Sequence, residues 1–241
     1  MIKAEGIHKT FEDFTALDNI TCNISDGCIY GMVGSNGAGK STFLRVLSGI
    51  YKPDKGCAYI NDEPIYENPK VKENIVFVSD ELFFLPGATM SKMADFYSSI
   101  YDRFNYDRFL KLAELFELNI KKPIANFSKG MKRQASIILA LSTRAKYMFF
   151  DETFDGLDPV MRNLVKKLIC NDVAEYDTTV IVTSHSLREL EDICDHLALL
   201  HKGGLVLDSD VLELKTTQFK VQIAFKGIFG KTKFEGLNIT R

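Results

Sequence analysis

Long hydrophobic runs are missing from this sequence of 241 residues. A membrane-spanning helix needs about 18 or more consecutive apolar residues, and no such stretch occurs. The strongest candidate, "IILALSTRAKYMFF", is interrupted by Arg144 and Lys146. The first residues, "MIKAEGIHKTFEDF", contain no apolar core of the kind that signal peptides carry. We therefore expect a chain that is soluble by itself.

Paired cysteines and an excess of charge are also missing. The five cysteines are scattered and include no CxxC pair, which predicts reduced thiols in a cytosolic protein rather than a disulfide framework or a zinc site. The 30 basic and 32 acidic residues give a net charge of −2. This balance argues against a general binder of nucleic acids or anionic membranes. The sequence contains no internal repeat and no low-complexity linker.

Apolar residues are plentiful, at 46 %, which is enough for one large α/β domain or two small ones. The nearly continuous apolar runs "KYMFFD" and "TTVIVTS" are typical of parallel strands that are covered on both faces. Between them, Asp158 as N-cap and Pro159 at the first helical position predict a helix, and hence a β–α–β unit. Strands are expected at 20–24, 28–33, 56–60, 75–79, 146–151 and 178–183.

The remaining segments predict a helical insert and a C-terminal β part. Residues 86–142 show helical spacing with no strand between, which indicates an insert between two halves of a sheet. Ser186 and Glu189 have capping-box spacing at the start of a further helix. The segment "HLALLHKGGLVLDSD" predicts two short strands that turn at Gly203–Gly204. We expect residues 211–241 to form a short extension of β type, either whole or cut short.

The segment "GSNGAGKST" concentrates glycines directly after an apolar strand and before a helical pattern. It matches G-x-x-x-x-G-K-[ST], in which glycines let backbone N–H groups surround a phosphate and the following helix adds its positive end. The lysine would reach the β- and γ-phosphates, and the first hydroxyl would bind Mg²⁺. The predicted phosphate-binding residues are Gly34, Ser35, Asn36, Gly37, Ala38, Gly39, Lys40, Ser41 and Thr42.

Two acidic residues follow the apolar run "KYMFF". A phosphate loop needs an acidic partner for Mg²⁺, usually at the end of another buried strand, and Asp151 stands there. Glu152 follows, where a carboxylate could polarise an attacking water. We therefore expect a site that binds ATP and Mg²⁺, with Ser41 and Asp151 at the metal. The presence of Glu152 favours hydrolysis.

Over about residues 2–210, the sequence resembles the ATP-binding cassette (ABC) ATPases, with several motifs in that family's order. The segment "FSKGMKRQ" resembles the family signature, with Ser128 and Gly130 at its serine and second glycine. "DETFDGLDP" resembles the extended Walker B segment and D-loop, with Asp158 as the D-loop aspartate. His185 stands at the position of the switch histidine, and Phe11 at that of an aromatic that stacks on adenine. Taken singly, Ser128 could be a helix N-cap, Phe11 a core aromatic and His185 a structural residue.

The resemblance implies a fold and a mechanism. The fold is a P-loop NTPase of ABC type, with a mixed central sheet, a helical insert at about 86–142 and an antiparallel β part, within an ATPase domain of residues 1–210. Two cassettes associate head to tail, and each ATP lies between one phosphate loop and the other cassette's signature. Glu152 would activate water, and Lys40 and His185 would hold the γ-phosphate. ATP then favours the closed dimer, and hydrolysis releases it.

The sequence departs from the family pattern at several positions. Thr153 stands where the family commonly has proline, and Lys129 and Met131 replace a glycine and a glutamine of the signature. The segment "IVFVSDELFFLPGAT" has Asp80 where the family usually has a glutamine that touches Mg²⁺ and senses the membrane partner. A carboxylate can also bind Mg²⁺, so Asp80 is a candidate metal ligand.

The resemblance predicts the nucleotide-binding subunit of an ABC transporter, on the cytoplasmic face of a membrane. Its partners would be an integral membrane permease and a second ATPase subunit, identical or different. Asp80 and "SKGMKR" are more similar to exporters of peptides or antibiotics than to importers. The alternatives are a soluble ABC protein that acts on ribosomes or DNA, and a nucleotide binder without turnover. The apolar segment 82–85 predicts that the membrane partner contacts residues 80–100.

Overall fold

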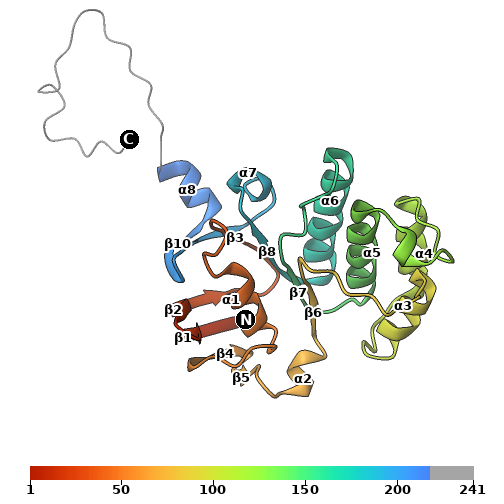
Figure 1. The fold of residues 1–241 in the computed structure, drawn as a ribbon. Helices are drawn as coiled ribbons and strands as arrows, with labels where there is room; N and C mark the ends of the chain where they lie inside the picture. Colours follow the sequence, from red (N-terminus) through yellow and green to blue (C-terminus); the bar gives the residue numbers. More distant parts are fainter. Residues whose placement is uncertain (218–241) are drawn as a thin grey trace, which may run out of the picture.

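The computed structural model describes residues 1–217, which form two β-sheets and a layer of helices (Figure 1). The first sheet is antiparallel, with the order β2-β1-β4-β5. Its strands are β1 (Ile2–Phe11), β2 (Phe14–Ile24), β4 (Lys55–Ile60) and β5 (Glu63–Pro64). Apolar residues of β1 such as Ile2, Ala4 and Ile7 are buried. The polar residues between them are more exposed, so this sheet covers the core with one face.

The second sheet has the order β10-β9-β3-β8-β7-β6. Its strands are β3 (Ile29–Val33), β6 (Ile75–Val78), β7 (Tyr147–Phe150), β8 (Thr179–Ser184), β9 (His196–His201) and β10 (Gly204–Asp210). All neighbouring pairs are parallel except β9 with β10. Because β3, β7 and β8 run in the same direction, the segments that follow them meet at one edge of the sheet. The phosphate loop, Asp151 and His185 follow these three strands.

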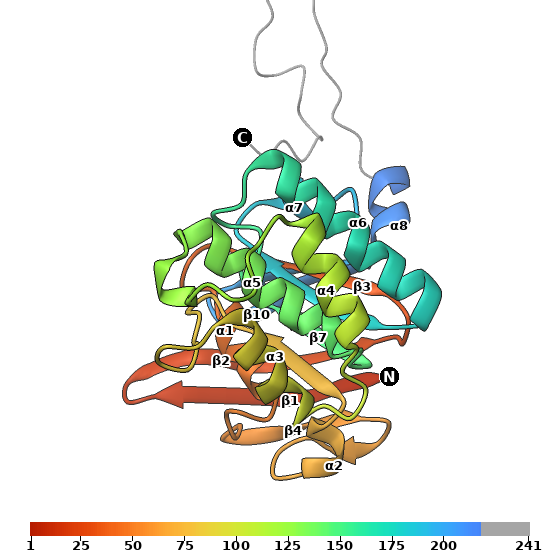
Figure 2. The ribbon, with the colours of Figure 1, turned by 90° about the vertical axis from the view of Figure 1, so that its right-hand side faces the viewer.

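Helices cover both faces of this second sheet. Helix α1 (Lys40–Leu47) packs with the antiparallel sheet into one apolar cluster, and α2 (Pro69–Lys72) lies beside it. The opposite face carries α3 (Met90–Ser98), α4 (Tyr106–Leu115), η1 (Ile124–Asn126), α5 (Lys129–Ser142) and α6 (Pro159–Tyr176), as Figure 2 shows. The last helices are α7 (Leu187–Leu190) and α8 (Val211–Thr217). The second sheet is the predicted mixed sheet, and the first sheet is the predicted antiparallel part. The buried apolar residues form two clusters.

Several local expectations differ from the structure. Residues 211–217 form the helix α8 and not a strand, because the side chain of Asp210 accepts the backbone N–H groups of Leu212 and Glu213 and so starts a helix. The rest of the predicted β extension, 218–241, lies outside the described residues. The β9–β10 turn is centred on Lys202 and Gly203, both with positive φ, so that Gly204 already belongs to β10.

The predicted capping box at Ser186 does not form. Ser186 is the N-cap of α7, but its side chain makes no capping hydrogen bond. The carboxylate of Glu189 instead accepts the hydroxyl of Ser184 at 2.6 Å and pairs with Arg162 at 2.8 Å. The carboxylate of Glu189 is thus engaged by the charged Arg162 and is not available for the capping box.

Candidate functional site

The phosphate loop joins β3 to α1 at the edge of the second sheet. Gly37 and Gly39 have φ values of 78° and 109°, which side chains rarely adopt, and a Cβ at Gly39 would lie 2.6 Å from the carbonyl oxygen of Ala16. The loop therefore needs glycine for its shape and for its fit against β2. Lys40, the first residue of α1, donates from Nζ to the carbonyl oxygens of Gly34 at 2.7 Å and Ser35 at 3.3 Å.

A cavity of about 850 Å³ opens beside this loop. It is large enough for a nucleotide, since ligand pockets generally measure roughly 300–1,000 Å³. Residues from five separate parts of the chain line it, and they include most of the residues that the motifs predicted. The lining consists of Phe14, Ala16, residues 35–42, Asp80, Glu152, Asp155 and His185.

Asp151 lies at the end of β7, fully buried. Its Oδ1 accepts the hydroxyl of Ser41 at 3.0 Å and that of Thr183 at 2.8 Å. Among the described residues, its Oδ2 is buried without a hydrogen-bond partner. Burial raises the pKa of Asp151, although the two hydroxyls act against this. An unpartnered carboxylate oxygen beside a serine hydroxyl is a donor set that fits Mg²⁺.

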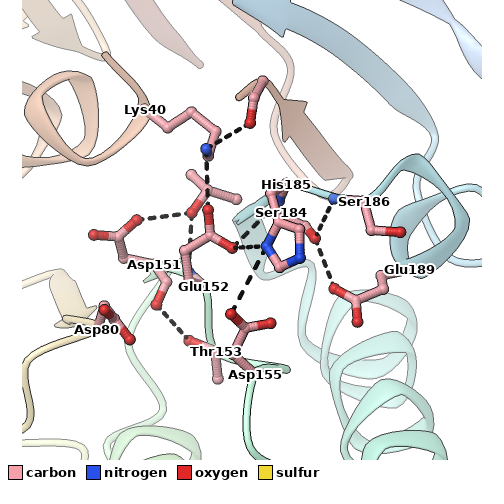
Figure 3. A network of polar contacts seen from close by, with 12 residues as sticks. Lys40, Asp80, Asp151, Glu152, Thr153, Asp155, Ser184, His185, Ser186 and Glu189 are labelled. Carbon is pink, nitrogen blue, oxygen red and sulfur yellow. Dashed lines mark hydrogen bonds and ion pairs between the residues drawn. The ribbon is translucent and has the colours of Figure 1, made fainter. Parts of the chain in front are cut away.

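Glu152 stands between the side chains of Lys40 and His185. Its Oε1 lies 3.0 Å from Nζ of Lys40, and its Oε2 lies 3.3 Å from Nδ1 of His185 (Figure 3). The hydroxyl of Thr183 accepts the backbone N–H of Glu152 at 3.0 Å. The backbone φ of Glu152 is 46°, in the left-handed region that is uncommon for residues other than glycine. The protein therefore holds this carboxylate in a strained but well-defined position, facing the cavity.

Asp155 is a cavity residue that the sequence motifs did not single out. Its Oδ2 lies 3.8 Å from Nδ1 of His185, on the side away from Lys40 (Figure 3). Burial raises the pKa of Asp155, while His185 acts in the opposite direction. The imidazole of His185 therefore faces two carboxylates. The only signal in the sequence was an extra acidic residue within "DETFDG".

Asp80 also lines the cavity, but its carboxylate is engaged. Its Oδ1 accepts Nη2 of the buried Arg133 at 2.6 Å, and Nη1 of Arg133 donates to the carbonyl of Ser79 at 3.0 Å. Arg133 belongs to α5, so this ion pair joins the signature helix to the end of β6. The role of Asp80 as a metal ligand stays a prediction, and that role requires its carboxylate to turn away from Arg133.

The signature and D-loop residues lie outside the cavity. The hydroxyl of Ser128 caps α5 by accepting the N–H of Met131 at 3.2 Å, and the carboxylate of Asp158 caps α6 by accepting two N–H groups. A Cβ at Gly130 would lie 3.2 Å from the carbonyl oxygen of Gly156, so the two segments are neighbours. Within one chain, Ser128, Gly130 and Asp158 do not line the cavity.

Two aromatic residues flank the turn between β1 and β2, where they pair in register. The ring of Phe14 lines the cavity, whereas Phe11 does not and packs edge-on against Tyr51. The adenine contact of Phe11 stays a prediction, and the structure adds Phe14, on the same hairpin, as a candidate. Phe11 was the residue predicted from the sequence, and the second aromatic of "FEDF" was the signal for Phe14.

Comparison with known proteins decides the family. The sequence model of the ABC transporter family matches residues 17–155, more than half of the chain. The chain belongs to the ABC transporter family. It is 32 % identical over 225 residues to the ABC transporter ATP-binding protein YtrB of Bacillus subtilis (strain 168), which covers 93 % of this chain and 77 % of YtrB. As a member of this family, the chain is an ABC transporter ATP-binding protein and an ATPase.

Further relatives and solved structures agree with this assignment. The linearmycin resistance ATP-binding protein LnrL of Bacillus subtilis (strain 168) is 31 % identical, and the bacitracin transport ATP-binding protein BcrA of Bacillus licheniformis is 30 % identical; each match covers 86 % of this chain and 68 % of the relative. The fold matches the ATP-binding subunit of an ABC transporter with a TM-score of 0.82 at 21 % identity, covering 90 % of this chain and 92 % of that one. It also matches the dimeric, post-hydrolysis cassette MJ0796 bound to ADP and Pi with a TM-score of 0.79 at 21 % identity, covering 88 % and 99 %. At these identities the structural likeness shows the fold alone. Among residues 1–217, no helix is long and apolar enough to cross a membrane.

Proposed function

We propose that this ABC ATPase binds Mg²⁺-ATP in the cavity beside the phosphate loop and uses Glu152 to activate the attacking water. The observation that carries the proposal is the convergence of Lys40, Glu152 and His185 on one cavity, next to the unpartnered Oδ2 of Asp151. These groups have the chemistry that phosphoryl transfer requires, namely cationic and N–H donors for phosphate, a ligand for the metal and a base for water.

The residues of the chain divide the work by position. N–H groups of the loop and the positive end of α1 hold the phosphates, while Lys40 turns from Glu152 toward them. Release of this ion pair frees the Glu152 carboxylate to accept a hydrogen bond from water. His185 contributes a ring N–H toward the γ-phosphate and keeps Glu152 oriented. Ser41 and Asp151 would hold Mg²⁺, which supplies positive charge to balance the negative charge of the phosphates.

The proposal includes a head-to-tail dimer. Ser128, Gly130 and Asp158 lie outside the cavity of their own chain and are available to a second cassette. The hydroxyl of Ser128 accepts the capping N–H and can still donate its own proton to a phosphate oxygen. The N-terminal end of α5 adds a positive dipole at the same place. Each site would then be completed by the signature of the other subunit.

The Glu152→Gln variant tests the base and the dimer together. It should bind ATP but hydrolyse it more slowly by at least 10²–10⁴-fold, which is the usual contribution of a general base. ATP-bound dimers should accumulate, because the step that reopens them is blocked, and size-exclusion chromatography with ATP would reveal them. Glu81→Gln, an exposed carboxylate on a nearby loop, is the matched control. Turnover near the wild-type rate in Glu152→Gln would assign the water to another group.

In its cellular role, the cassette would lie on the cytoplasmic face of a membrane and power a partner that spans that membrane. The names of relatives that act in linearmycin resistance and bacitracin transport support an exporter of peptides or antibiotics. The segment 82–85 offers a contact surface, because Leu82 and Phe84 pack against the core while Phe83 is 76 % exposed.

Co-purification tests this assembly. The tagged wild-type chain should retain a multi-span membrane protein, and Phe83→Asp should lose it while keeping ATP binding. Leu110→Asp, an exposed apolar residue on α4, is the control. Retention by Phe83→Asp equal to wild type would place the contact elsewhere. Co-purification of ribosomes or nucleic acid instead of a membrane protein would overturn the transport role.

A further inference from the structure

An apolar groove of about 470 Å³ lies on the side of the second sheet that carries α7 and α8. Its walls come from the end of β3, from α7, from the β9–β10 hairpin and from α8, which lie close together in Figure 1. The apolar side chains that line it are Val33, Leu187, Leu197, Ala198, Leu199, Leu207, Val211 and Leu214. Among the described residues that line it, Glu191 and Lys215 alone are charged, and Nζ of Lys215 donates to the carbonyl of Glu191 at 3.2 Å. Leu187 is 50 % exposed, so the groove offers apolar surface that the described residues leave uncovered.

The position of the groove links it to the nucleotide site. Val33 directly precedes Gly34 of the phosphate loop, and it pairs in register with Leu199 of β9. Leu187 begins α7, two residues after His185. A segment that fills the groove would therefore press on the backbone that leads into both parts of the site.

The chain itself carries a segment that suits the groove. α8 supplies one wall through Val211, Leu214 and Lys215 and ends at Thr217, the last described residue, so the described part of the chain ends beside the groove. The 24 residues 218–241 include "QFKVQIAF", in which apolar residues alternate with polar ones. Alternate side chains of an extended segment share one face, so Phe219, Val221, Ile223 and Phe225 would make a single apolar edge.

Charge favours the same pairing. Residues 187–217, which supply most of the groove, contain seven acidic and three basic residues, but Glu189 and Asp192 pair with Arg162 and Lys166, so that a formal net charge of −2 remains. Residues 218–241 contain five basic residues and one acidic residue, a net charge of +4. Opposite charge and a short covalent link both raise the local concentration of the segment at the groove.

We propose that residues 218–241 dock in this groove, with the apolar edge of 219–225 against Leu187, Leu199 and Leu207. The docked segment is then an internal contact of the cassette that braces β3 and α7 behind the phosphate loop. This inference does not depend on the transported substrate or on the identity of the catalytic base.

Site-specific photocrosslinking in the full chain tests the docking. The photoreactive residue p-benzoylphenylalanine replaces Leu187 in one variant and Ile50 in a control, because the two leucine-sized side chains are 50 % and 53 % exposed and Ile50 lies outside the groove. After irradiation and proteolysis, mass spectrometry should find crosslinks from position 187 to peptides of 218–241. Their yield should exceed that of the control several-fold and should not depend on protein concentration.

Three results would overturn the proposal. They are no crosslink from position 187 to 218–241, an equal yield from position 50, or crosslinks that occur only in covalent dimers, which would make a second copy the occupant. A Lys220→Glu/Lys226→Glu variant in the full chain examines the charge argument. Its crosslink yield should fall several-fold, and an unchanged yield would remove the electrostatic basis on which this occupant was chosen.

Discussion

At the scale of single residues, the ion pair between Lys40 and Glu152 dominates the site. Both side chains are largely withdrawn from solvent, and their charged atoms lie 3.0 Å apart. An arriving phosphate competes with Glu152 for Lys40, so part of the attraction between Lys40 and ATP replaces an existing contact instead of adding a new one. In the proposed mechanism, this pair engages the carboxylate of Glu152 until a nucleotide binds Lys40.

The charge of Asp80 predicts how the affinity for ATP depends on Mg²⁺. If its carboxylate joins Asp151 at Mg²⁺, the site carries one more negative charge than the usual glutamine would supply, so ATP without metal should be repelled more strongly. Asp80→Gln should therefore bind metal-free ATP more tightly and depend less steeply on Mg²⁺. Calorimetric titrations with and without Mg²⁺ measure both quantities, and Glu81→Gln is the control.

The contact with Arg133 gives the opposing outcome for Asp80. If Asp80→Gln changes neither quantity, Asp80 serves only as the partner of Arg133. A lowered melting temperature together with unchanged binding would then assign the residue to the joint between α5 and β6.

At the scale of elements, a buried charge cluster joins α4 to α6. Asp172 of α6 is 2 % exposed, and its Oδ1 lies 2.5 Å from Nη2 of Arg108 on α4 and 3.9 Å from Nη1 of Arg144. Burial raises the pKa of Asp172, while the two guanidinium groups act in the opposite direction. The cluster fixes α4 to α6, the helix that follows β7.

Asp172→Ala should lower the free energy of unfolding by about 3 kcal/mol, because the substitution leaves buried guanidinium groups without their counter-ion. Urea unfolding followed by circular dichroism measures the change. Glu175→Ala, which removes an exposed carboxylate from the same helix, should change stability far less. Equal effects of the two substitutions would show that the cluster contributes nothing beyond an ordinary surface charge.

Sequence patterns predicted the elements whose residues are buried on both faces. The runs 147–150 and 179–184 are buried throughout, and β7 and β8 are parallel neighbours as expected. Strand β1 was missed, because outward residues such as Lys3, Glu5 and Lys9 interrupt its apolar pattern. Helix α8 was misjudged because alternating apolar residues favoured a strand, whereas the cap from Asp210 decided for a helix.

The candidate site was predictable where neighbouring residues in the chain act together. The phosphate loop and the Asp151–Glu152 pair are local motifs, and parallel strands bring them to one edge. The contacts of Glu152 with Lys40, of His185 with Asp155 and of Asp80 with Arg133 were not predictable. Each joins residues whose separation or orientation depends on tertiary packing, and no local pattern encodes it.

At the scale of the whole molecule, thiols report how tightly the two apolar clusters are closed. Burial raises the pKa of Cys22 to about 12 and that of Cys28 to about 11, and it raises the pKa of Cys194 as well. A raised pKa lowers the reactive thiolate fraction, which falls about tenfold for each unit by which the pH lies below the pKa. At pH 8 in the folded protein, these three cysteines should resist alkylation.

Intact-mass measurements after iodoacetamide treatment check this expectation. Cys57, half-buried on β4, should react first, and all five cysteines should react once urea unfolds the chain. The protection should weaken as the pH approaches 11. Labelling of Cys22 or Cys28 at the rate of Cys57 would mean that the sheets separate readily in solution.

The place of β3 in the second sheet determines when the nucleotide site can be completed during synthesis. β3 lies between β8 and β9, and the hairpin that follows β9 touches the phosphate loop, since Gly203 donates its N–H to the carbonyl of Ala38 at 3.0 Å. These neighbours leave the ribosome about 150 residues after β3, a delay of roughly 10–30 s at usual rates of translation. Until then, the glycine loop has neither of its flanking strands. A nascent chain therefore acquires its affinity for ATP late, after the helical layer has been made.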